Sequence, residues 1–195
     1  MFLKLLLFLS AMSLRDTFSE PLISLGYDLD SLVSNGKILE AGCQFGDLVA
    51  ELRICNPYIC GVDYDTRILQ KIRENSAEYA AIHGFEYYPN ILMADVARLP
   101  FRDNSFDLII SRTLFASTGE REIIEALRAM SENRPYELSS IFDMQNAMIR
   151  ELYRVLKQGG IYLLFDNRSV FTLPLLDFKQ LYPEKGRDFK LILQK

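Results

Sequence analysis

The sequence has few of the residues that metal and disulfide sites need. Its 195 residues include one histidine, His83, and three cysteines, Cys43, Cys55 and Cys60. A single histidine excludes any motif that requires two, and three cysteines cannot all pair within one chain. None of the cysteines lies in a Cys-x-x-Cys or mixed His/Cys cluster, so we predict neither a disulfide framework nor a metal site. A reducing compartment, the cytoplasm, is the simpler prediction.

An excess of positive charge is also missing. The chain has 22 lysines and arginines against 26 aspartates and glutamates, which gives a net charge of −4. Proteins that track a phosphate backbone usually carry a basic surplus. The composition therefore argues against a nucleic-acid partner, and with 49% hydrophobic residues the chain can bury a substantial core.

Apolar runs long enough to span a bilayer are absent as well. The longest, at the N-terminus, lies within "MFLKLLLFLSAMS", residues 1–13, and is well short of the roughly 20 residues that a spanning helix needs. A lysine before the run and small residues after it resemble a secretory signal. Secretion or membrane association through residues 1–13 therefore stays an alternative to a packed N-terminal helix in a cytoplasmic protein.

Apolar runs of strand length do occur, and they alternate with helical patterns. The runs are Lys37–Glu40, Tyr58–Asp63, Ile91–Ala94, Phe106–Ser111 and Gly160–Asp166, and helical spacing fits 47–55, 65–83, 119–135 and 136–157. This alternation predicts an α/β fold with a Rossmann-like, doubly wound, mostly parallel sheet. Lys157 and Gly159 are expected to close the last helix. Two short runs around Pro183–Gly186 predict a C-terminal antiparallel β-hairpin.

Glycines and acids gather at the predicted carboxyl ends of the strands, where open α/β sheets bind ligands. The first strand runs into "ILEAGCQFGD", residues 38–47, in which Gly42 and Gly46 allow a tight turn. Asp63 ends the second strand, where a carboxylate can accept from both hydroxyls of a ribose. Asp95 follows the third strand, where it can accept from an exocyclic amine. Each feature alone is commonly a turn or a helix cap, but the three in order indicate a nucleoside-containing ligand.

Four stretches together resemble the class I S-adenosylmethionine-dependent methyltransferases of the small-molecule type. "ILEAGCQFGD" resembles the family's first motif, and "GVDYD" its acidic second-strand motif. "ADVARLPFRDNSFDLIIS" is similar to the stretch that links strands three and four, and "IRELYRVLKQGGIYLL" to the helix and fifth strand. The resemblance covers about residues 36–166, and the C-terminal hairpin fits the family's last two strands.

The resemblance implies S-adenosyl-L-methionine as the cofactor. The residues that it implies for the site are Glu40, Gly42, Cys43, Gln44, Gly46, Asp63, Tyr64, Asp95, Val96 and Ser111. The first four would line the methionine end. Asp63 would hold the ribose with Tyr64 beside the adenine, and Asp95 would accept from the adenine amine while Val96 packs near the ring. Ser111 would lie near the methionine moiety or the transferred methyl group.

A nicotinamide dinucleotide is the alternative ligand. Its fingerprint, G-x-G-x-x-G, needs a second glycine so that the pyrophosphate can approach the backbone. Gln44 occupies that place, and the spacing from Gly42 to Gly46 is one residue short. S-adenosylmethionine has no pyrophosphate, so the departure counts more against the dinucleotide.

The expected reaction is direct displacement of a methyl group onto a small-molecule or lipid acceptor. A catalytically inactive methyltransferase-like binding or regulatory subunit, and a protein or RNA methyltransferase, stay as alternatives. No catalytic motif is visible, and the place of His83 in the pattern is away from the strand ends. Arg112, Arg134 or Tyr136 could contact the acceptor.

We expect a single domain of 195 residues. Its parts are an N-terminal helical segment (1–35), a cofactor-binding half (36–113), a helical insertion (114–157) and C-terminal strands (158–195). The N-terminal helices and the insertion would build the acceptor side. Neither the acceptor nor the oligomeric state follows from the sequence.

Overall fold

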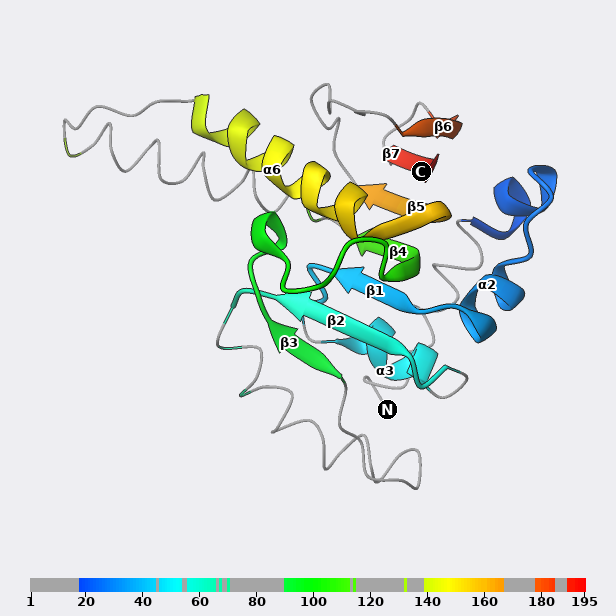
Figure 1. The fold of residues 1–195 in the computed structure, drawn as a ribbon, viewed down its shortest axis with the longest axis horizontal. Helices are drawn as coiled ribbons and strands as arrows, with labels where there is room; N and C mark the ends of the chain where they lie inside the picture. The colour runs from blue at the N-terminus through cyan, green and yellow to red at the C-terminus, as the bar shows by residue number, and fades with distance from the viewer. Residues whose placement is uncertain are drawn as a thin grey trace.

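Seven strands make up a single sheet in the order β3-β2-β1-β4-β5-β7-β6, as the computed structural model in Figure 1 shows. The strands are β1 Ile38–Ala41, β2 Ile59–Asp63, β3 Ile91–Met93, β4 Phe106–Arg112, β5 Leu156–Asp166, β6 Lys179–Glu184 and β7 Phe189–Gln194. The helices are α2 Leu29–Asn35, α3 Asp47–Arg53, α6 Ser139–Val155 and the short 3-10 helix η1 Val96–Arg98, and residues 18–24 are also helical. The structure describes residues 18–44, 46–53, 56–65, 67, 70, 90–112, 114, 132, 139–166, 178–184 and 189–195.

The sheet is parallel from β3 to β5 and ends in an antiparallel hairpin. β1 pairs in parallel with both β2 and β4, and the pairs β2–β3 and β4–β5 are parallel too. β7 pairs antiparallel with β5 on one side and with β6 on the other. The chain winds outward in opposite directions from β1 and β4, so the switch point of the topology lies between these two strands. The doubly wound, mostly parallel sheet with its C-terminal hairpin is confirmed.

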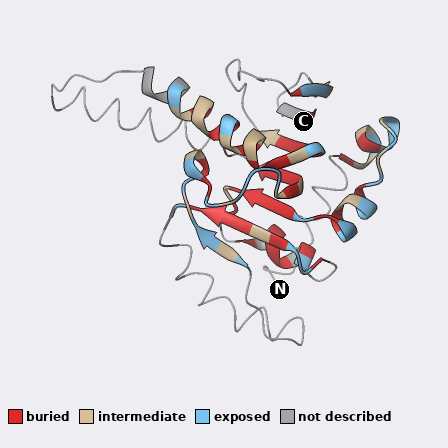
Figure 2. Ribbon diagram, in the orientation of Figure 1, coloured by how far each residue is buried: buried red, intermediate tan, exposed pale blue. Residues whose placement is uncertain are grey.

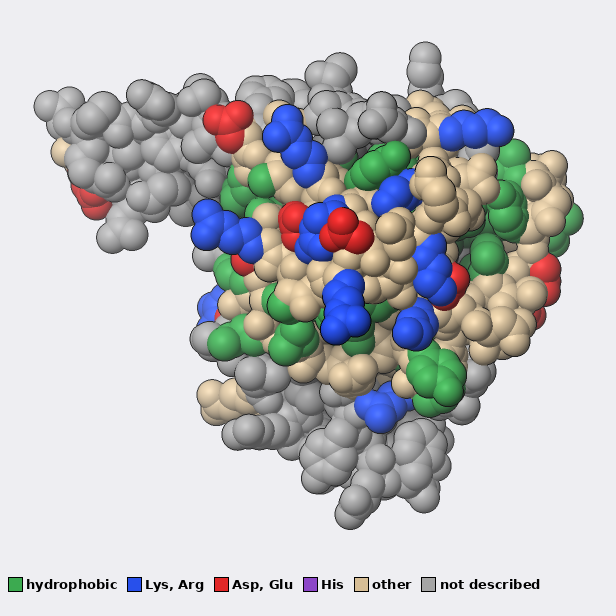
Figure 3. Space-filling model, viewed as in Figure 1, with side chains coloured by type: hydrophobic (Ala, Val, Ile, Leu, Met, Phe, Trp, Pro, Cys, Tyr) green, Lys and Arg blue, Asp and Glu red, His purple; other side chains and the backbone are tan. Residues whose placement is uncertain are grey.

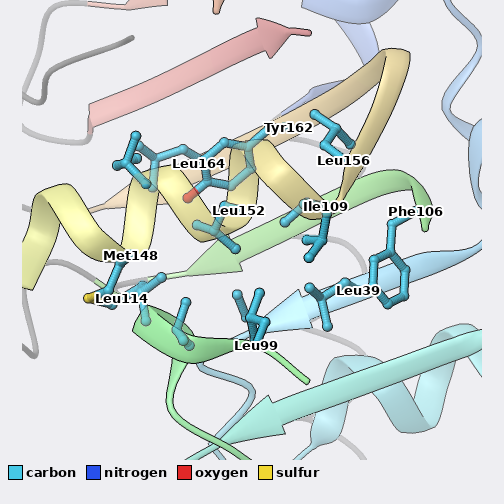
Figure 4. Packing of buried hydrophobic residues seen from close by; sticks show 14 of the residues in the cluster. Leu39, Leu99, Phe106, Ile109, Leu114, Met148, Leu152, Leu156, Tyr162 and Leu164 are labelled. Carbon is cyan, nitrogen blue, oxygen red and sulfur yellow. The ribbon is translucent and has the colours of Figure 1, made fainter. Parts of the chain in front are cut away.

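Both faces of the sheet are covered. Successive residues of a strand send their side chains to opposite sides, so the central strands each contribute to two hydrophobic clusters. In β1, Ile38 packs with residues from 18–24, α2 and α3, whereas Leu39 packs on the α6 side. Leu108 and Ile109 divide in the same way in β4. Figure 2 shows the central strands buried along most of their length, and Figure 4 shows α6 packed over the strands. Burial on both faces explains why the strands read as nearly continuous apolar runs.

One buried polar side chain fixes how the N-terminal helices join the sheet. The Asn56 amide is fully buried and donates to the carbonyls of Val33 and Gly36, the second at 2.7 Å. Its oxygen accepts from the N–H of Tyr58 at 2.7 Å. Asn56 thus ties the end of α2 to the start of β2. The predicted helices of the N-terminal segment are confirmed for residues 18–24 and α2.

The helix before β5 ends earlier than the sequence pattern predicts. α6 stops at Val155 and β5 begins at Leu156, which pairs with the first residue of β4. The prediction that Lys157 and Gly159 close the helix is wrong. Gly159 instead has a φ of 76° and donates its N–H to the carbonyl of Lys195, so it lies within a strand beside the C-terminus. Strand pairing of Leu156 with β4, and the bond from Gly159 to Lys195, take the place of the last helical turn that the sequence pattern predicts.

Several predictions fall on residues outside the described part of the chain. These include the helix at 119–135, most of the helix at 65–83 and the apolar segment at 1–13. The division of the chain into functional parts stays a prediction. Within the described residues, no helix has both the length and the apolar character needed to cross a membrane.

Candidate functional site

The turn between β1 and α3 has, among its described residues, three in the left-handed region of backbone space. Gly42 has a φ of 72°, Gln44 of 47° and Gly46 of 72°. This φ would strain any side chain at Gly42, and a Cβ atom there would lie 2.8 Å from Cδ1 of Leu114, so the Leu114 side chain would have to shift. The two glycines predicted for this turn therefore meet a real steric need. The third left-handed position is taken by glutamine, whose side chain is exposed.

Four described backbone N–H groups of this turn form hydrogen bonds within the protein. Gly42 and Cys43 both donate to the carbonyl of Val62, at 2.9 and 3.0 Å. Gln44 donates to Oδ2 of Asp63 at 3.0 Å, and the N–H of Gly46 bonds to the carbonyl of Cys43 at 2.8 Å. A phosphate-binding turn instead directs its N–H groups toward the ligand. These four residues therefore do not form a phosphate cradle.

Asp63 braces the glycine turn against the end of β2. Its carboxylate is 9% exposed and accepts from two backbone N–H groups, those of Gln44 and Asp65, each at 3.0 Å. A carboxylate has about four acceptor positions, so two remain for a ligand. The next strand lies alongside, because Ala94 donates its N–H to the carbonyl of Asp63 at 2.9 Å. The ends of β1, β2 and β3 are thus linked at one edge of the sheet.

Asp95, Val96 and Tyr64 lie beside this linked edge. Asp95 directly follows Ala94 and caps η1, accepting from the N–H of Ala97 at 2.9 Å. Val96 is buried, and Tyr64 is 53% exposed. An exposed acid, a buried aliphatic side chain and an exposed aromatic ring therefore stand near the ends of β2 and β3. These side chains have the chemistry to contact an adenine, although Asp95 also has the capping role that an isolated acid often takes.

Cys43 fills space beneath the turn. It is buried, and a Cβ atom on Gly61 of β2 would lie 2.7 Å from its Sγ. Burial, reinforced by the negative charges of Glu40 and Asp63, raises the pKa of the Cys43 thiol far above its ordinary value. A thiol that stays protonated is a poor nucleophile. Cys43 therefore contributes packing and its backbone rather than covalent chemistry.

Glu40 and Arg112 join the ends of β1 and β4. Glu40 is 1% exposed, and its Oε1 lies 3.0 Å from Nη2 of Arg112, whose side chain is 26% exposed. A buried carboxylate needs such a partner, because an isolated buried charge is costly. Arg112, which the sequence suggests as an acceptor contact, is therefore held against Glu40 at the switch point.

Ser111 is buried inside the sheet. It is fully buried, and its Oγ lies 2.7 Å from the hydroxyl of Tyr162, also fully buried, on β5. The structure thus places Ser111 within the core rather than at an exposed strand end. His83, Arg134 and Tyr136 lie outside the described residues. Within the described residues, no group of three or more His, Cys, Asp or Glu side chains is placed to hold a metal ion.

A family model decides what kind of domain this is. Residues 38–133, about half of the chain, match the model described as a methyltransferase domain. The match includes the glycine turn, Asp63, Asp95 and Ser111. The chain belongs to the class I methyltransferases.

Two solved structures share the fold of this methyltransferase domain. The PH0226 protein of Pyrococcus horikoshii is 18% identical with a TM-score of 0.57, over 92% of this chain and 90% of that one. A SAM-dependent methyltransferase of Methanosarcina mazei is 16% identical with a TM-score of 0.55, over 83% of this chain and 93% of that one. At such low identity the likeness establishes the fold.

A curated relative has a named activity. The 2-phytyl-1,4-naphtoquinone methyltransferase of Nostoc punctiforme is 29% identical over 156 residues, which is 76% of this chain and 54% of the relative. The chain spans about half the length of the curated relatives it matches. The relatives therefore contain sequence that has no counterpart here.

Sequence reasoning missed a polar clamp in this methyltransferase domain. Glu151 of α6 accepts from the N–H of Leu99 at 2.8 Å, and Arg154 donates to the carbonyls of Leu99 and Phe101 at 2.9 and 2.8 Å. Arg154 also bonds to Glu151 and Asp103. The clamp fixes the segment that follows η1, the short helix that Asp95 caps. The signal available in the sequence was the pair Glu151 and Arg154, two charged residues three apart on a helix that also has an apolar stripe.

Proposed function

We propose that this domain transfers a methyl group from S-adenosylmethionine to a small-molecule or lipid acceptor. One observation carries the proposal. Acidic side chains gather at the carboxyl ends of β1, β2 and β3, beside a glycine turn whose described N–H groups are already hydrogen-bonded within the protein. The class I family uses this cofactor, and the relative named as a naphtoquinone methyltransferase supports a small, apolar acceptor.

The charge at the strand ends fits S-adenosylmethionine better than a dinucleotide. Glu40, Asp63, Asp65 and Asp95 lie at or next to the ends of β1, β2 and β3, and Arg112 and Arg67 are each bonded to one of these acids. A pyrophosphate would add negative charge without finding the N–H groups of the turn. A positively charged sulfonium and ammonium would instead be attracted to the acids.

Each side chain at this edge then has a proposed task. Asp63 accepts from the ribose hydroxyls with its two remaining acceptor positions, and Asp95 accepts from the adenine amine while Tyr64 and Val96 contact the ring. The methionine end lies along the turn from Glu40 through Gly42, Cys43, Gln44 and Gly46, with Ser111 behind it in the sheet. S-adenosylmethionine, when bound, supplies an activated methyl group on its sulfur. The protein's part is to align donor and acceptor and to exclude water.

A small acceptor also agrees with the surface. On the face shown in Figure 3, the described lysine and arginine side chains are scattered among other polar side chains and backbone, with a few acidic side chains beside them, and do not form one continuous stripe. A polynucleotide would be tracked by a continuous basic stripe. Acceptors that arrive deprotonated would need no dedicated base.

Calorimetry with S-adenosylhomocysteine and with NAD tests the cofactor assignment. We expect the wild type to bind S-adenosylhomocysteine and not NAD. We expect Asp95→Asn, which keeps the size of the side chain but offers a donor to the adenine amine, to bind roughly tenfold more weakly, a loss of about 1.4 kcal/mol. Failure of the folded wild type to bind S-adenosylhomocysteine would contradict the proposal.

Turnover separates the proposal from its main alternative. The assay would supply S-adenosylmethionine with reduced naphthoquinones and other phenolic small molecules, and follow S-adenosylhomocysteine formation. Binding without turnover on the whole panel would favour an inactive binding or regulatory subunit. Methylation of an RNA or protein fraction alone would favour the other alternative.

A further inference from the structure

Gln44 is the residue of the glycine turn that least fits a purely structural role. It holds a φ of 47°, a conformation that costs a side-chain-bearing residue about 1–2 kcal/mol and glycine almost nothing. Its backbone is fixed by the bond from its N–H to Asp63. Its side chain is nevertheless exposed at the ligand edge of the sheet. Strained residues that persist at such an edge point to a function of the side chain.

The amino-acid end of the proposed cofactor requires hydrogen-bond donors at this edge of the sheet. The amino-acid end of S-adenosylmethionine carries a carboxylate as well as an ammonium group. The described N–H groups of the turn are engaged within the protein, and Asp63 and Glu40 lie close by. Arg112 already donates to Glu40. The side-chain amide of Gln44 adds two neutral N–H donors at this edge that can face a carboxylate.

We propose that Gln44 is a specificity-determining residue that donates a hydrogen bond from Nε2 to the α-carboxylate of the bound cofactor. The inference rests on the proposed function and extends it to the amino-acid end of the same site. It gives the glutamine a role that a glycine could not fill. The strained backbone places this amide at the edge of the sheet while the N–H of Gln44 still braces the turn.

The test pairs a change in the residue with a change in the ligand. The ligands are S-adenosylhomocysteine and its decarboxylated analogue, which lacks only the carboxylate. The variants are Gln44→Ala, which keeps the strained backbone without the amide, and Gln44→Glu, which keeps the size but places a negative charge there. Gln158→Glu, an exposed glutamine at the start of β5, is the matched control for the added charge.

We expect calorimetry to show a loss that depends on the carboxylate. Gln44→Ala should bind S-adenosylhomocysteine roughly tenfold more weakly, which corresponds to about 1.4 kcal/mol, and Gln44→Glu should bind it more weakly still. Affinity for the decarboxylated analogue should change less than about threefold in Gln44→Ala, a factor within the usual non-specific effect of a surface substitution. Gln158→Glu should leave both affinities as in the wild type.

Two results would overturn the inference while leaving the proposed function intact. One is an equal loss, or no loss, for both ligands in Gln44→Ala. The other is a Gln44→Gly variant that binds S-adenosylhomocysteine as tightly as the wild type or more tightly, which would mean that the side chain only narrows the site. A folded wild type that binds neither ligand would instead remove the proposed function and this inference together.

Discussion

Replacing Asp63 should destabilise the fold even with no ligand present, because it removes the hydrogen bonds that join the glycine turn to the end of β2. The Asp63 carboxylate accepts from the N–H groups of Gln44 and Asp65, each at 3.0 Å, and is 9% exposed. Hydrogen bonds to a charged partner contribute about 1.5–3 kcal/mol each. Because water can reach the N–H groups that an alanine leaves behind, we take the lower end. Asp63→Ala should then lower the free energy of unfolding by about 3 kcal/mol, and Asp63→Asn, which keeps one acceptor oxygen, by about half of that.

Urea denaturation followed by circular dichroism measures this loss. The midpoint should fall while the slope with denaturant stays the same, because the surface exposed on unfolding is unchanged. Asp95→Ala is the matched control: its exposed carboxylate accepts a single capping bond, from Ala97, and the variant should lose only about 0.5–1 kcal/mol. Equal losses in the two alanine variants, or a loss below about 0.5 kcal/mol for Asp63→Ala, would show that Asp63 does not brace the turn.

Three further predictions concern packing, pH and thiol chemistry. Gly61→Ala should lower the free energy of unfolding by about 1–3 kcal/mol in a urea titration, because the new Cβ would lie 2.7 Å from Sγ of Cys43. An unchanged midpoint would show that the turn can move aside without cost. The side-chain hydrogen bond from Arg154 lowers the pKa of Glu151 below the ordinary 4.5. The stabilisation of the folded state by this bond is therefore complete above pH 4.5 and is lost as the pH falls through the lower, folded-state pKa. Glu151→Gln should therefore be less stable than the wild type at neutral pH, and the gap should close in acid; a gap that does not change with pH would refute the charge-based explanation. Burial raises the pKa of Cys60 to about 11 and that of Cys43 further, so in a Cys55→Ser variant both thiols should react slowly with a thiol reagent until urea unfolds the chain, and prompt labelling of the native protein would contradict this.

Much of the fold follows from local sequence pattern. The run predicted at Phe106–Ser111 is found as Phe106–Arg112, and the described strands follow one another as expected, because strands buried on both faces leave continuous apolar runs. The position of the site follows from topology alone, since parallel strands bring their carboxyl ends to one edge. The glycines of the turn could be predicted because a left-handed backbone disfavours residues that carry a side chain.

The contacts of individual site residues could not be predicted, because they depend on strand register. Ser111 is a strand-end residue in the sequence, but its partner Tyr162 stands on β5, and the β4–β5 ladder shifts register between Phe106 and Leu108. The pairing of Glu40 with Arg112 likewise requires the register of β1 against β4. Periodicity identifies a strand, and long-range pairing decides what each residue touches.

The clamp between α6 and the segment after η1 joins two distant stretches of the chain that both resemble the methyltransferase family. Residues 95–107 run from the proposed adenine side to β4 with only a short 3-10 helix, so most of this segment lacks the internal hydrogen bonds of a regular element. Arg154 and Glu151 supply those bonds from α6, satisfying the N–H of Leu99 and two carbonyls. The sequence of the loop and that of the helix are therefore two halves of one structural unit. Because η1 lies between Asp95 and the clamped segment, a substitution in the clamp should disturb ligand binding at Asp95, although neither clamp residue is among those proposed to contact the ligand.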